Sequence, residues 1–98
     1  MDLMDKKLVE KVKKYRGLTK KALDKIVVFK DLSEKEKKTA KVFLEMAKNY
    51  YSDAQYFEEK KELLTALAAY SYAHAWLDAG VKARFFDAKN DSKLFVLP

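Results

Sequence analysis

The spacing of apolar side chains predicts three helices. Over residues 2–29 apolar residues recur at steps of three and four, which places them on one face of a helix. The same spacing returns over residues 34–61 and again over residues 62–86. Ser33 and Glu36 form a capping-box sequence, so the second helix is expected to begin there and to end near Lys60 and Lys61. Gly17 lies inside the first helix and marks a candidate kink.

The third helix is apolar on two sides. One side carries large residues such as Leu67 and Leu77, and the other carries a run of alanines that Trp76 interrupts. A helix with two apolar faces contacts two neighbours, so this helix is expected to be the central one. Its alanines would allow the backbone of another helix to approach closely.

Residues 87–98 differ from the rest. A turn sequence at residues 89–92 separates Phe85 and Phe86 from the apolar run of residues 94–97. We expect a hairpin or an extended arm whose Phe95 and Leu97 pack on the bundle, with pairing to another chain as the alternative. The predicted fold is therefore all-α, an up-down-up three-helix bundle (residues 1–86) with a short C-terminal extended or hairpin arm (residues 87–98).

Composition narrows the class of protein. Of the 98 residues, 49% are hydrophobic and 37% are charged, and there are two glycines, one proline and no cysteine. The lack of cysteine excludes a disulfide scaffold, a thiolate zinc site and a cysteine nucleophile. No signal peptide is visible, and the most apolar window, residues 63–81, contains Asp78, which disfavours a membrane span. We expect a cytoplasmic protein with no membrane partner.

The net charge of +6 comes from an excess of basic residues in the first half of the chain. The first helix carries a lysine ridge, defined here as Lys7, Lys11, Lys14, Lys21 and Lys25. Such a ridge can bind a polyanion such as nucleic acid weakly, or it can be a solvated helix face. Only two basic residues are arginines, and lysine is poorly suited to reading a base sequence.

His74 is the only histidine, and Asp78 follows four residues later, within hydrogen-bonding reach on a helix. Such a pair could orient a general base, but no nucleophile accompanies it and a metal site needs a third ligand. A structural histidine in a polar pocket with Tyr50 or Tyr70 is the favoured interpretation. Asp53 lies roughly 9 Å from His74 along the helix axes, too far for a direct pair. We therefore expect no enzyme activity, no metal and no cofactor.

The third helix also resembles a known family. The run Tyr72-Ala73-His74-Ala75-Trp76-Leu77-Asp78-Ala79-Gly80-Val81 is similar to the signature of the small archaeal "domain of unknown function 357" proteins. The resemblance extends over about residues 15–86 and implies a soluble three-helix protein without an established activity. It draws attention to six positions as candidate interaction or polar-core residues: Tyr50, Asp53, Tyr72, His74, Trp76 and Asp78.

The aromatic residues and the apolar arm favour one function class. Tyr50, Tyr70 and Trp76 have core spacing, whereas Tyr72 lies off the main seams and could belong to an interface, where tyrosine is enriched. The sequence predicts a non-enzymatic protein-interaction module that binds an unknown protein or a second copy of itself. The alternative is a nucleic-acid-binding accessory protein that uses the lysine ridge.

Overall fold

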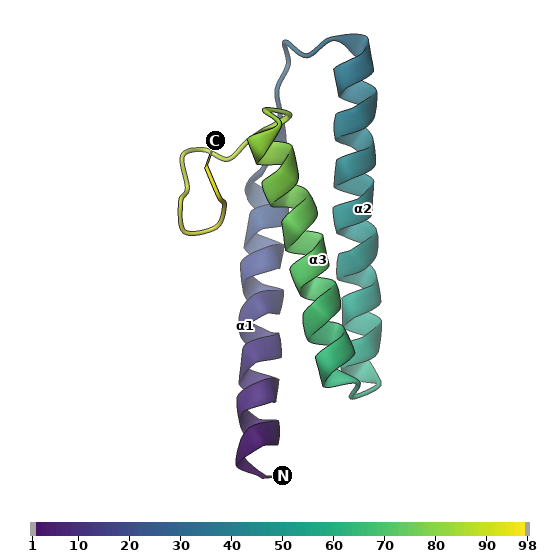
Figure 1. The fold of residues 1–98 in the computed structure, drawn as a ribbon, viewed down its shortest axis with the longest axis vertical. Coiled ribbons are helices and arrows are strands. Elements are labelled where there is room, and N and C mark those ends of the chain that lie inside the picture. Colours follow the sequence, from purple (N-terminus) through teal and green to yellow (C-terminus); the bar gives the residue numbers. More distant parts are fainter. Residues whose placement is uncertain (1, 98) are drawn as a thin grey trace.

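The computed structural model describes residues 2–97 and contains three helices (Figure 1). In the view of Figure 1, α1 (Leu3–Lys25) runs upward, α2 (Glu34–Glu59) runs downward and α3 (Leu63–Lys82) runs upward again. Two short strands, β1 (Val27–Val28) and β2 (Phe86–Asp87), form an antiparallel pair beside the upper end of the bundle. The predicted up-down-up bundle is confirmed.

Helix α3 is the central element, as its two apolar sides predicted. It packs along α2 and along α1, whereas α1 and α2 contact each other little. Small residues line the contact between α2 and α3, because both helices bury one at every seventh position. These residues are Ala40, Ala47 and Ala54 on α2, and Ala66, Ala73 and Gly80 on α3. Small side chains at heptad spacing let the two backbones approach closely along their length.

The core has two parts. The lower part surrounds Val12 and Tyr70 and joins the three helices near the α2–α3 turn. The upper part contains Leu77 and Val81 together with Phe86 and Phe95, which come from the segment after α3. The C-terminal segment therefore completes the upper core instead of leaving it open to solvent.

Helix α1 ends four residues earlier than predicted. The periodicity placed its end at Phe29, but Ile26 is already extended, and Val27 and Val28 pair with Asp87 and Phe86. The cause is the run of β-branched residues at positions 26–28, which favours extended backbone over helix. The helix continues through Gly17 without a break in its assignment.

Helix α3 also ends four residues earlier than predicted, at Lys82 instead of Phe86. Arg84 adopts the left-handed conformation with φ 62°, and the Phe85 N–H donates to the Gly80 carbonyl at 2.9 Å. This pattern is a Schellman motif with arginine at the position that glycine usually occupies. Helix α2 is followed by the same motif, with Lys61 in the left-handed conformation, so it ends near the predicted position. It begins with the predicted capping box at Ser33.

The arm, residues 88–97, folds back on the bundle of its own chain (Figure 1). Lys89 and Asn90 both adopt left-handed backbone and reverse the chain at the predicted turn. The remainder lies beside α1 and α3 in the upper half of the molecule, with Phe95 only 4% exposed. Among residues 2–97, no helix combines the length and the apolarity needed to cross a membrane.

Candidate functional site

His74 and Asp78 bind the arm and not each other. His74 Nε2 faces the Leu94 carbonyl oxygen, and its Nδ1 lies 3.1 Å from the Thr19 hydroxyl. Because a carbonyl can only accept, Nε2 donates to it, which leaves Nδ1 of a neutral ring to accept from the Thr19 hydroxyl. Asp78 Oδ1 accepts from the Val96 N–H at 2.9 Å.

His74 is a structural histidine, but its partners are Thr19 and Leu94 and not the expected Tyr50 or Tyr70, and the possible hydrogen bond to Asp78 does not form. The physical reason is the arm, whose free backbone groups in an extended segment need partners that a helix would supply internally. The expectation that Asp53 and His74 do not pair agrees with their positions, since Asp53 is exposed on α2 and His74 faces α1 and the arm.

On the opposite flank of α3, aromatic residues form a groove with α2. We call it the aromatic groove; its volume is about 280 Å³ and it is lined by Tyr50, Tyr72, Ala75, Trp76 and Ala79. The Tyr50 and Tyr72 rings lie 5.5 Å apart, and Trp76 packs edge-on against Phe43 at 5.0 Å. The structure thus brings three of the six candidate positions together, with two alanines as the small residues between them.

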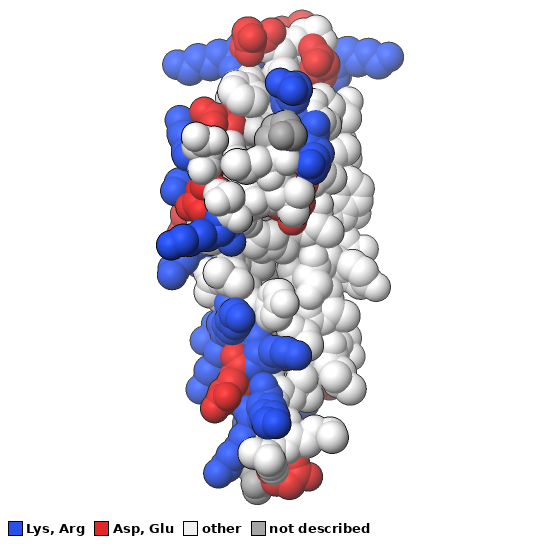
Figure 2. Space-filling view, turned by 60° about the vertical axis from the view of Figure 1, so that its left-hand side comes forward, with Lys and Arg blue, Asp and Glu red and all other residues white. Residues whose placement is uncertain are grey.

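The lysine ridge is divided by the fold. Lys25 forms an ion pair with Asp91 of the arm at 2.7 Å, and this bond is the main reason that the pKa of Asp91 lies below its usual range. Lys7, Lys11 and Lys14 line a groove of about 620 Å³ near the other end of α1, and Lys21 is exposed between the two groups. In the view of Figure 2, basic side chains gather on the lower half of the molecule, next to a patch without charged side chains.

A polar network that the sequence did not reveal joins all three helices. The Tyr70 hydroxyl donates to Glu58 Oε1 at 2.8 Å, and Arg16 forms an ion pair with Oε2 of the same carboxylate. Tyr70 is fully buried, and burial, followed by the bond to Glu58, raises the pKa of its phenol. No sequence spacing signals this contact, because its members come from three separate helices.

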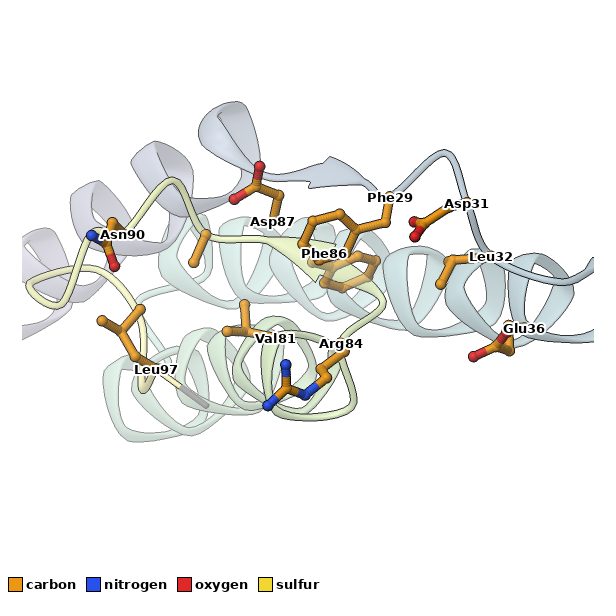
Figure 3. A pocket seen from close by; sticks show the side chains of 11 residues that line it. Phe29, Asp31, Leu32, Glu36, Val81, Arg84, Phe86, Asp87, Asn90 and Leu97 are labelled. Carbon is orange, nitrogen blue, oxygen red and sulfur yellow. The ribbon is translucent and has the colours of Figure 1, made fainter.

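A pocket of about 700 Å³ lies at the upper end of the molecule (Figure 3). Its apolar lining includes Phe29, Phe86 and Leu97, and in the view of Figure 3 Arg84 lies across the pocket from Asp31 and Asp87. This pocket could not be predicted from residue spacing, because its walls come from the β1–α2 connection, the end of α3 and the arm.

The carboxylates around this pocket are partly engaged within the chain. Glu36 accepts from the Ser33 N–H in the capping box, and Asp87 accepts from the Lys89 N–H and lies 3.4 Å from the Lys89 ammonium. Within residues 2–97, no three side chains of the His, Cys, Asp and Glu types gather as a metal site.

Comparison with known proteins gives one match. The sequence model of a protein family described as "Protein of unknown function (DUF357)" matches residues 14–86. The matched segment includes the aromatic groove, His74 and Asp78, and it ends before the arm. No curated protein and no solved structure matches the chain.

Proposed function

Because the chain belongs to the DUF357 family, whose function is unknown, we propose a role from its own surface: it is a non-enzymatic protein-interaction module. The observation that carries this proposal is the aromatic groove between α2 and α3. Tyrosine and tryptophan are enriched at protein interfaces, where they combine a large apolar surface with a polar group.

Exposure within the groove supports docking of a partner. Tyr72 is 58% exposed, although its ring packs beside that of Tyr50, so a large part of an aromatic side chain remains for a partner to cover. Ala75 and Ala79 leave room between the larger side chains, which gives an apolar partner residue a place to insert. The partner is another protein or a second copy of this chain.

A pair of matched tyrosine variants tests the proposal. Tyr72→Ser removes the exposed wall of the groove, and Tyr56→Ser removes a tyrosine of α2 that is 56% exposed and lies outside it. The tagged full-length proteins are used to capture partners from extract of the source organism, and sedimentation velocity measures self-association. We expect the wild type and Tyr56→Ser to retain a partner or a dimer. Tyr72→Ser should bind the partner, or a second copy, at least about tenfold more weakly, as expected for loss of a central aromatic contact.

Two results would overturn this function. One is equal capture or association by the wild type and Tyr72→Ser. The other is a wild type that is strictly monomeric and captures no protein. Circular dichroism of each variant verifies that the helical content is unchanged, which is expected because both substituted side chains are more than half exposed.

A further inference from the structure

The seam between α1 and α3 is filled along its upper half and open along its lower half. In the upper half, Phe95 of the arm is buried, and His74 and Asp78 bind the backbone groups of Leu94 and Val96. The arm is also held by Lys25 of the lysine ridge, whose ammonium group pairs with Asp91. The arm itself, with an apolar run at residues 94–97 and the carboxylate of Asp91, therefore occupies this part of the seam.

The lower half, called here the basic groove, has a volume of about 620 Å³. Met4, Leu8 and Leu64 supply its apolar surface, and Met4 and Leu64 are 77% and 72% exposed. Lys7, Lys11 and Lys14, at steps of four and three, form a basic row beside Met4 and Leu8 on the helix. Asp5 and Glu10 also line the groove.

We propose that the basic groove binds an acidic amphipathic helix of a partner protein. Large apolar side chains of that helix would cover Met4, Leu8 and Leu64, and its carboxylates, at the same steps of four and three, would pair with the three lysines. The Lys25–Asp91 pair is the precedent within the molecule, because it joins the lysine ridge to a carboxylate on the segment that fills the adjoining seam.

The side chains of the basic groove favour a helix over an extended segment. An extended segment has free backbone N–H and C=O groups, and the upper seam supplies His74 and Asp78 to bind them. The basic groove contains no histidine, and its two carboxylates, Asp5 and Glu10, are exposed and lie among the lysines of the same helix. A helix satisfies its own backbone internally, so it needs only apolar contacts and charges from this surface.

Charge and apolarity select against other occupants. A second copy would bring the same row of lysines against itself, and like charges at an interface disfavour binding. A nucleic acid would pair with the lysines but would leave the apolar side chains of Met4 and Leu64 without a matching surface. A carboxylate-bearing amphipathic helix is complementary to both parts of the groove.

The test uses the full chain and a fluorescent peptide of about 20 residues, long enough for a helix of about 30 Å. The peptide carries leucine at heptad positions a and d and glutamate at the flanking positions, and a scrambled peptide of equal composition is its control. Binding is followed by fluorescence anisotropy. We expect affinity for the designed peptide that falls with salt, and no comparable affinity for the scrambled one.

Matched variants locate the binding. Leu64→Ser changes the apolar part of the groove, and Lys11→Glu changes its basic row. Val42→Ser and Lys38→Glu make corresponding changes at exposed positions of α2. We expect the first pair to bind at least about tenfold more weakly and the second pair to bind as the wild type does, since burial of a leucine alone is worth about this factor. Met4→Ser removes a second apolar side chain of the groove, at a similarly exposed site.

Three outcomes would overturn the proposal. The first is no binding of the designed peptide by the wild type. The second is binding that Leu64→Ser and Met4→Ser leave unchanged, because the apolar part of the groove would then have no role. The third is binding of a single-stranded oligonucleotide or of anionic phosphatidylglycerol vesicles that is stronger than peptide binding, which would assign the lysines to a different partner.

Discussion

At the residue scale, His74 is bound on both ring nitrogens by groups of its own chain. Thr19 lies on α1 and Leu94 on the arm, so the ring links two segments that are far apart in sequence. A general base needs a free nitrogen for its substrate, and here neither nitrogen is free while the arm is in place. His74 is therefore not placed to act as a general base while the arm is bound.

The two glycines predict opposite effects of the same substitution. Nothing lies within 4 Å of a Cβ built on Gly17, so Gly17→Ala should stabilise the protein by about 0.5–1 kcal/mol through reduced backbone entropy of the unfolded chain. A Cβ on Gly80 would overlap the buried Phe86 ring, so Gly80→Ala should destabilise the protein by about 1–3 kcal/mol. Urea unfolding followed by circular dichroism measures both changes.

Each glycine variant is the control for the other, because both substitutions add one methyl group inside a helix. If Gly80→Ala were as stable as Gly17→Ala, the close contact between α3 and Phe86 would be wrong. If Gly17→Ala were destabilising, the open space beside α1 at this position would be wrong.

At the element scale, the helix ends hold residues in backbone conformations that suit glycine better. Lys61 has φ 63° after α2, a conformation that costs a residue with a Cβ about 1–2 kcal/mol. Lys61→Gly should therefore raise the free energy of unfolding by about 1 kcal/mol. Lys60 precedes it with φ −78°, so Lys60→Gly should instead lower stability by about 0.5–1 kcal/mol.

The comparison of these neighbouring variants by thermal or urea unfolding checks the motif directly. Equal effects of glycine at positions 60 and 61 would contradict a left-handed residue at Lys61. The same reasoning applies to Arg84 after α3, where φ is 62°.

Elements whose signals lie in neighbouring residues could be predicted from the sequence. The capping box at Ser33 gave the start of α2, and two apolar faces gave the central place of α3. The ends of α1 and α3 could not be placed, because the apolar periodicity continues into residues 26–29 and 83–86 while the backbone leaves the helix. There the β-branched run and the pairing of β1 with β2 decide the structure.

The candidate site was predictable only in part, for the same reason. Tyr50, Tyr72 and Trp76 could be chosen as aromatic candidates, and the antiparallel α2–α3 pair brings them together. The partners of His74 and Asp78 could not be predicted, because they depend on where the arm lies. The arm's position results from long-range contacts such as the burial of Phe95 in the upper core.

At the scale of the whole molecule, α3 separates two grooves that differ in chemistry. The aromatic groove lies on its α2 flank, and the seam that contains the arm and the basic groove lies on its α1 flank. The molecule is elongated, with extents of 51 × 23 × 16 Å, so both flanks are long relative to its thickness. Two partners could therefore bind at the same time without competing for the same helix face.

The Arg16–Glu58–Tyr70 network joins the three helices and predicts a response to alkaline pH. Burial and the bond to Glu58 raise the folded-state pKa of Tyr70 above the ordinary value of 10.0. Stability that depends on the protonated phenol is therefore fully present below pH 10.0 and is lost as the pH rises above it. There the unfolded chain releases a proton that the folded chain retains, so the free energy of unfolding must fall with pH.

Tyr70→Phe removes this titration and keeps the ring, so its free energy of unfolding should fall less steeply above about pH 10 than that of the wild type. Urea unfolding at a series of pH values measures the two slopes, which should differ by up to one bound proton. The other tyrosines and the lysines titrate in both proteins, so their effect cancels, and Tyr56→Phe, at an exposed site, should retain the wild-type slope. Parallel pH profiles for the wild type and Tyr70→Phe would show that the buried phenol does not hold its proton, and the network would then not couple the three helices as the geometry requires.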